Sequence, residues 1–189
     1  YKSRLYTIPT FAYNPHIYNI FQMKQISQKT ILNITRGNQK KLALFEIQLL
    51  CAEVIGKSRE FVITHPEYVL SSSQLSTLQS QIRRRLKGEP IAYILGHKEF
   101  YGLAFLVNKH TLIPRPETEL VTDLVLDKLR NLLRNKLRNT SIIDIGTGSG
   151  NIIISIAHNI QHETHNIKHA TKLYGIDISK EALKVARKN

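Results

Sequence analysis

The sequence has one cysteine, no long apolar run and few acidic residues. A single cysteine among 189 residues, Cys51, excludes a disulfide within the chain. No apolar run reaches the length that a membrane-spanning helix needs. Only 14 aspartate and glutamate residues stand against 27 lysine and arginine residues, and none of the acids precedes Glu46. This composition excludes a disulfide-stabilised scaffold and fits a reducing compartment, in which Cys51 packs as a small buried side chain.

The excess of basic residues has two interpretations. A formal net charge of +13 favours an anionic partner such as RNA or a ribosome-associated protein. Abundant Ile, Asn, Lys and Tyr are equally what an AT-rich coding sequence produces, with no functional meaning. The run Arg83–Arg85 carries the same ambiguity, because it suits either an acidic partner surface or a solvated helix face.

The first half of the chain predicts a flexible extension and then helices. Residues 1–23 hold prolines and aromatics without a period, and Lys2 and Arg4 are too few basic residues for a convincing transit peptide. Residues 24–89 predict a small helical domain. Gly56 ends its first clear helix, a short helix and a turn at Pro66 follow, and serines 71–73 cap a third helix. The expected buried stripes of the first and third helices are Leu42, Phe45, Leu49 and Ala52, and Leu75, Leu78, Ile82 and Leu86.

The second half predicts a β-hairpin and then an α/β unit. Aromatic and β-branched residues flank Tyr101-Gly102, so residues 91–110 are expected to form the hairpin. Two prolines make "IPRPET" extended, and residues 117–137 follow as a long amphipathic helix. Strands at 141–145 and 172–176 alternate with helices at 151–160 and 179–188. This β–α–β–α order is the start of a parallel α/β sheet.

Between the first of these strands and its helix, three glycines stand at every second position. The segment "DIGTGSGN" places Gly146, Gly148 and Gly150 where a strand enters a helix. Glycines there let backbone N–H groups approach a ligand. The alternative interpretation is that the glycines only form a tight turn and bind no ligand. The spacing is one residue shorter than the dinucleotide fingerprint G-x-G-x-x-G.

Two carboxylates near this loop indicate which ligand it prefers. Asp177 ends the next strand, where it can accept both hydroxyls of a ribose; its alternative role is a helix N-cap, which Ser179 can fill instead. Asp144 lies two residues before the first glycine, and its alternative role is a turn carboxylate. A carboxylate at that position repels a pyrophosphate but complements an ammonium and a sulfonium. The electrostatics therefore favour S-adenosyl-L-methionine over NAD.

Three segments together resemble a known family. "GEPIAYILG", "FYG" and "IPRPETE", followed by "IIDIGTGSGNIIISIA" and "LYGIDISKEALKVARKN", resemble the HemK/PrmC-type methyltransferases. The resemblance covers about residues 41–189. It implies methyl transfer from S-adenosyl-L-methionine to the side-chain amide of a glutamine in peptide-chain release factors. The implied fold is a helical substrate-recognition domain, a β-hairpin linker at 90–116, and at 117–189 the start of a class I, Rossmann-like methyltransferase domain.

The resemblance also assigns roles to individual residues. Asp177 would hold the ribose, and the segment from Arg115 to Glu119 would line the cofactor side of the site, unless it is only a rigid linker. The possible lining residues are Arg115, Glu117 and Thr118. The methionine side of the cofactor would be bound by Asp144, Gly146, Thr147, Gly148, Ser149 and Gly150. No metal ligand is implied.

One element of the family is absent from these residues. The family's reaction depends on an Asn-Pro-Pro-Tyr motif after the fourth strand, and the last proline here is Pro116. We therefore expect an incomplete form of the enzyme that holds no catalytic residue, leaves one sheet edge and face uncovered, and transfers no methyl group by itself. The expected setting is a cytoplasmic monomer that can work near the ribosome, with a mitochondrial location as the alternative.

Other interpretations stay open at this point. A nucleic-acid amino-methyltransferase shares the catalytic motif and suits the basic charge, and a non-catalytic fragment that binds a release factor is a further alternative. The spacing of His158, His162, His165 and His169 permits a zinc site, but their polar surroundings favour a solvated loop.

Overall fold

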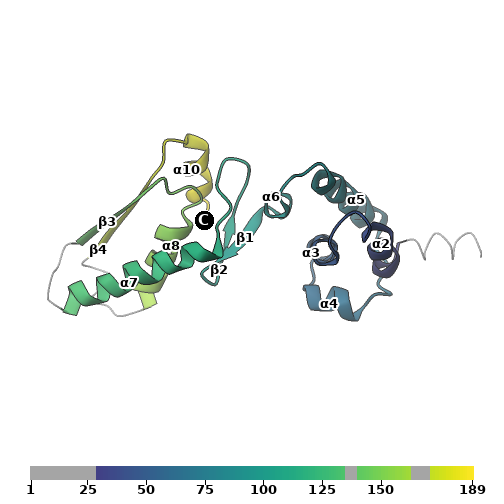
Figure 1. Ribbon diagram of the computed structural model, residues 1–189, viewed down its shortest axis with the longest axis horizontal. Coiled ribbons are helices and arrows are strands. Elements are labelled where there is room, and N and C mark those ends of the chain that lie inside the picture. The colour runs from purple at the N-terminus through teal and green to yellow at the C-terminus, as the bar shows by residue number, and fades with distance from the viewer. Residues whose placement is uncertain (1–28, 135–139, 163–170) are drawn as a thin grey trace, which may run out of the picture. The chain divides into compact units, whose positions relative to one another are not determined.

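The computed structural model describes residues 29–134, 140–162 and 171–189. These residues form two compact units that divide between Lys87 and Gly88. The first unit is helical, and the second holds a hairpin, two parallel strands and the helices that follow them (Figure 1). None of the described helices is long and apolar enough to cross a membrane.

The described residues of the first unit, from 29 to 87, form four helices: α2 (Ile31–Asn38), α3 (Leu44–Ile55), α4 (Arg59–Thr64) and α5 (Ser72–Leu86). Two predicted helix boundaries are confirmed. Gly56 ends α3 in the left-handed conformation with φ 64°, and Ser71 begins α5 with a capping box that includes Gln74. In both cases the capping residue satisfies backbone groups that the helix end leaves unpaired.

The predicted buried face of α3 is right at Ala52 but wrong at Phe45. Phe45 is 52% exposed, and its ring lies against the guanidinium of Arg59. The residues that α3 buries are Ile47, Leu50, Cys51, Ala52 and Ile55. The helix is apolar over most of its circumference, so its periodicity alone could not select the buried side. Burial of Cys51 was predicted correctly, and it raises the pKa of the thiol to about 12.

The predicted α5 stripe is right only at its centre. Leu78 and Ile82 are buried, whereas Leu86 is 46% exposed. One residue earlier, Arg85 joins α5 to α3, because its Nε and Nη2 atoms both lie 3.0 Å from Glu46 Oε1. This arginine therefore belongs to a tertiary ion pair rather than to a purely solvated face.

The second unit begins with a short helix that the sequence prediction missed. Residues Ile91–Leu95 form α6, between Pro90 at its N-cap and Gly96 at φ 82°. Proline and a left-handed glycine delimit a helix here despite the β-branched content of the segment. The hairpin is therefore shorter than predicted. It consists of β1 (His97–Phe100) and β2 (Leu103–Leu106), which pair antiparallel around Tyr101-Gly102.

The segment after the hairpin is extended only as far as Arg115. Pro116–Thr118 then form a 3-10 turn, η1, that leads into α7 (Glu119–Arg134). The expected extension of this helix beyond residue 134 lies outside the described residues. The strands β3 (Thr140–Ile145) and β4 (Thr171–Ile176) pair in parallel, as predicted. Helix α8 (Asn151–His162) connects them in the chain, and α10 (Lys180–Ala186) follows β4.

Residues of α7, α8 and one face of the strand pair form the core of this unit. Leu126 and Leu129 pack with Ile156 and Ile160, and the inward side chains of both strands border this cluster. The opposite face of the pair exposes Ile143, Ile145, Tyr174 and Ile176. The predicted architecture is thus confirmed as far as the elements show it: helices, a hairpin, and the β–α–β–α start of a parallel α/β unit.

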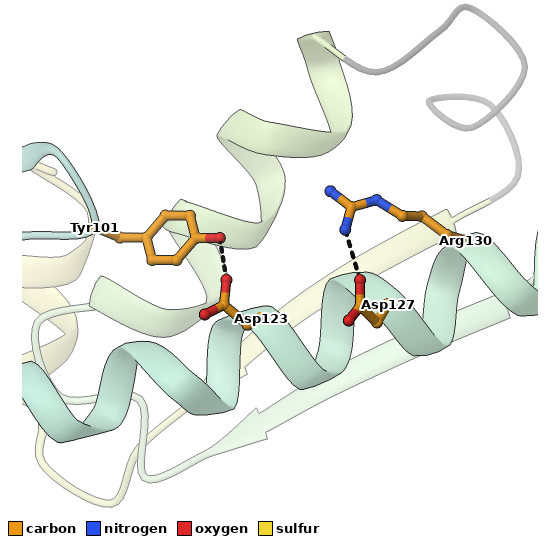
Figure 2. Close-up of polar contacts among 4 residues, drawn as sticks. All are labelled: Tyr101, Asp123, Asp127 and Arg130. Carbon is orange, nitrogen blue, oxygen red and sulfur yellow. Dashed lines mark hydrogen bonds and ion pairs between the residues drawn. The ribbon is translucent and has the colours of Figure 1, made fainter.

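The turn of the hairpin is attached to α7 by two carboxylates. Tyr101 has φ 53°, a left-handed conformation that the tight turn imposes although the residue is not glycine. Its backbone N–H donates to Glu119 Oε1 at 2.9 Å, and its hydroxyl donates to Asp123 Oδ1 at 2.6 Å. Figure 2 shows this hydroxyl directed at Asp123, with the Asp127–Arg130 pair further along the same helix. Hydrogen bonding to Asp123 raises the pKa of Tyr101 to about 12.

A pH-dependent stability follows from the Tyr101–Asp123 contact. The folded chain keeps Tyr101 protonated above its ordinary pKa of 10.0. The contact therefore stabilises the fold below about pH 10 and is lost as the pH rises towards 12. We expect Tyr101→Phe to lower the free energy of unfolding by about 0.5–1 kcal/mol at pH 7 and by less at pH 11, measured by urea unfolding. Tyr174→Phe is the control and should change neither value; an equal loss for Tyr101→Phe at both pH values would contradict the assignment.

Candidate functional site

The glycine loop lies at the carboxyl ends of the two parallel strands. Because β3 and β4 are parallel and in register, the loop after Ile145 and the turn after Ile176 meet at the same edge. This edge is where open α/β sheets bind their ligands. Gly146, Gly148 and Gly150 all have positive φ values, of 79°, 56° and 80°. The alternation seen in the sequence is therefore a conformational requirement of the loop.

The loop is held to the end of β4 by its own backbone. The N–H groups of Gly146 and Thr147 both donate to the carbonyl of Ile176, at 2.8 and 2.9 Å. The Gly150 N–H donates to the carbonyl of Thr147. These donors are consequently engaged within the protein. A pyrophosphate needs several free N–H groups at such a loop, and this loop does not present those three.

Asp177 binds the middle of the loop. Its Oδ2 accepts the N–H of Gly148 at 2.9 Å, and its Oδ1 accepts the N–H of Ser179 at 2.8 Å. These two bonds hold the pKa of the carboxyl below its ordinary value, so it is ionised at neutral pH. The N-cap of α10 is Ser179, whose hydroxyl accepts the N–H of Ala182. Asp177 therefore does not serve as the cap, and its remaining lone pairs can accept ligand hydroxyls.

Asp144 lies on the other side of the loop. Its Oδ2 accepts the hydroxyl of Thr147 at 2.7 Å. Two carboxylates thus contact adjacent loop residues, Thr147 and Gly148, and give the loop a local negative potential. Such a potential favours a cationic group over a phosphate.

Two contacts near the loop were not predicted from the sequence. The first involves Gly175 of β4, where an added Cβ would stand 2.9 Å from Thr147 Oγ1. The second involves Asn189, whose side-chain amide donates to the carbonyl of Ser149. A glycine inside a strand signals a close approach and could have marked Gly175. No local pattern could have marked Asn189, since its partners are distant in sequence.

The predicted site residues are only partly brought together. The structure places Asp177 beside the loop that follows Asp144. No described hydrogen bond or ion pair joins Arg115, Glu117 or Thr118 to this loop; the N–H of Thr118 donates to the carbonyl of Arg115. Glu119, which we expected on the cofactor side, accepts the backbone N–H of Tyr101.

The described residues hold no group of three or more potential metal ligands. Two of the four histidines considered, His165 and His169, lie outside the described residues. The choice between a solvated loop and the disfavoured zinc site is therefore not tested.

Comparisons with known proteins extend the resemblance to both units. Residues 36–96 match the model of the PrmC N-terminal domain. Residues 136–189 match the model of a methyltransferase domain. The resemblance to the HemK/PrmC-type methyltransferases is confirmed.

Curated relatives give the same result along most of the chain. A release factor glutamine methyltransferase of Coxiella burnetii is 43% identical over 149 residues, which is 79% of this chain and 49% of the relative. Proteins with the same name from Aliivibrio fischeri and Haemophilus influenzae are 38% and 30% identical, each over 88% of this chain and over 54% and 57% of the relative. The chain thus spans about half the length of the curated relatives it matches.

A substitution at Gly175 tests the packing of the loop on β4. We expect Gly175→Ala to displace Thr147 from Asp144 and to lower the free energy of unfolding by about 1–3 kcal/mol, measured by urea unfolding. Thr147→Ser removes one of the atoms that the new methyl group meets, so the double variant should be more stable than the two single effects predict.

The control for this prediction is Gly37→Ala. Nothing lies within 4 Å of a Cβ at Gly37, which is inside α2. Alanine there should raise stability by up to about 1 kcal/mol. Strict additivity of Gly175→Ala and Thr147→Ser would show that the two residues do not touch.

Proposed function

We propose that this chain carries the cofactor-binding start of an S-adenosyl-L-methionine-dependent methyltransferase that modifies a glutamine side-chain amide in a peptide-chain release factor. The observation that carries the proposal is the pair of carboxylates on a loop whose backbone donors are largely engaged. That arrangement suits a cationic, phosphate-free nucleoside ligand better than a dinucleotide. The names of the curated relatives support the reaction and the substrate class.

The residues present fit this cofactor in three respects. Nothing lies within 4 Å of a Cβ built at Gly146, so the loop is open at that position. The ionised Asp177 can accept ribose hydroxyls while it holds Gly148. Asp144 would complement the positive charge of the methionine portion. When bound, S-adenosyl-L-methionine would supply the methyl group to be transferred.

The reaction needs more than these residues provide. An amide nitrogen is a weak nucleophile because its lone pair is delocalised, so the site must orient the amide and stabilise its transition state. The family's Asn-Pro-Pro-Tyr motif does this, and no two prolines are adjacent anywhere in these 189 residues. We therefore propose that the chain contributes no catalytic residue and transfers no methyl group by itself.

The first unit supplies the proposed recognition of the release factor. It matches the PrmC N-terminal domain and carries neither the glycine loop nor its two carboxylates. We propose that this unit binds the protein substrate and that the protein acts in the cytoplasm. Ribosome proximity and a monomeric state remain part of the proposal.

Cofactor binding tests the proposed site directly. We expect the chain to bind S-adenosyl-L-methionine in isothermal titration calorimetry and to bind NAD far more weakly. Asp177→Asn should weaken the S-adenosyl-L-methionine affinity about tenfold, because a hydrogen bond to a charged acceptor contributes about 1.5–3 kcal/mol. Asp127→Asn is the matched control, since Asp127 pairs with Arg130 on the exposed face of α7. Equal affinity for NAD, or an equal loss in both variants, would refute the site.

A methyl-transfer assay tests the proposed division of labour. The chain, a release factor and S-adenosyl-L-methionine with a labelled methyl group are incubated together, and labelled glutamine is sought by mass spectrometry. We expect no label above background, whereas the Coxiella burnetii relative should label the same factor. Labelling by this chain alone would show that it holds a complete catalytic site.

A further inference from the structure

Asn189 connects the hairpin to the glycine loop. Its Oδ1 accepts the backbone N–H of Leu106 at 2.7 Å. Its Nδ2 donates to the Leu106 carbonyl at 3.2 Å and to the Ser149 carbonyl at 2.9 Å. One side chain therefore bonds to the last residue of β2 and to the loop between β3 and α8.

The geometry uses all the donors of this amide. Both hydrogens of Nδ2 are engaged, and the Leu106 N–H identifies which end of the amide carries the oxygen. Val107 donates its own N–H to Gly96, on the β1 side of the hairpin. The polar groups of Leu106 consequently lie on the outer edge of β2, and the Asn189 amide occupies the place that a neighbouring strand would take.

The loop end of this contact is the part that a ligand would touch. Ser149 is 1% exposed and follows Gly148, whose N–H is bound by Asp177. A ligand that shifts the backbone at Gly148 must also shift the Ser149 carbonyl or strain its bond to Asn189. Among the described residues, β1–β2 and β3–β4 share no backbone ladder, so side-chain contacts of this kind transmit the shift.

We infer that Asn189 is a positioning residue, which holds the outer edge of the hairpin on the glycine loop so that the two respond together to the cofactor. The part of this inference that concerns the cofactor rests on the proposed function. The mechanical link between Asn189, Leu106 and Ser149 stands without it. By thermodynamic reciprocity, cofactor binding should order Leu106, and loss of Asn189 should weaken cofactor binding.

Amide hydrogen exchange of the full 189-residue chain, followed by NMR, tests the mechanical link. We expect the Leu106 N–H to exchange about tenfold faster in Asn189→Ala than in the unmodified chain. Asn189→Asp, which has nearly the same shape, can still accept that N–H but cannot donate to either carbonyl. It should protect Leu106 less than asparagine does, because its second oxygen would face two carbonyl oxygens, and it should change the chemical shift of the Ser149 carbonyl. Unchanged Leu106 exchange in Asn189→Ala would overturn the inference.

The cofactor arm repeats these measurements with S-adenosyl-L-methionine. In the unmodified chain the cofactor should slow Leu106 exchange several-fold. In Asn189→Ala its affinity should fall about fivefold, and Leu106 should no longer respond. Asn38→Ala, which removes a similar side-chain bond to a backbone carbonyl in α2, should change neither quantity.

The two arms separate the possible failures. Unchanged affinity together with a persistent Leu106 response in Asn189→Ala would overturn the coupling. Absence of binding by the unmodified chain would overturn the proposed function, and the cofactor-free exchange rates would then decide the mechanical link by themselves.

Discussion

The candidate site depends on the two hydrogen bonds that the carboxylate of Asp177 accepts. Two parallel strands bring their following loops to one edge, but strand pairing stops at Ile145 and Ile176. Beyond that point Asp177 continues the connection, because one oxygen holds Gly148 and the other holds Ser179 at the start of α10. The same two bonds keep its pKa low, so the connection and the negative charge persist together at neutral pH.

This local charge contrasts with the basic chain around it. The chain carries a net charge of +13, yet the residues that contact the loop through side chains include Asp144 and Asp177. Net charge acts over the whole surface and is screened beyond about 10 Å, whereas a ligand in direct contact responds to the nearest groups. An anionic macromolecular partner and a cationic cofactor are therefore compatible on one protein.

The sequence predicted features that depend on local chemistry. Gly56 ends a helix and Ser71 begins one because each satisfies backbone groups of its own neighbours. The parallel pairing of β3 and β4 followed from the order of strands and helices. The loop conformation was likewise implied by the glycine spacing, since alternate residues there have positive φ.

Two features that depend on distant partners were missed, and so was one short helix. The buried side of α3 is decided by what packs against it, and an almost uniformly apolar helix gives no signal. Helix α6 was hidden because its β-branched residues outweighed Pro90 and Gly96 in the prediction. Asn189 could not be recognised at all, because Leu106 lies 83 residues away and Ser149 lies 40 residues away.

The hairpin illustrates how such distant contacts determine the geometry of the site. At its turn, Glu119 and Asp123 bind Tyr101, and at its other end Asn189 binds Leu106. Two attachments at opposite ends restrict rotation of the hairpin far more than either one, since a single contact acts as a pivot. The attachment at the turn is to α7, whose residues pack with α8, and the attachment at the other end also reaches Ser149. The orientation of the hairpin is thereby tied to the backbone of the glycine loop, although in the described part of the chain the two sheets share no strand.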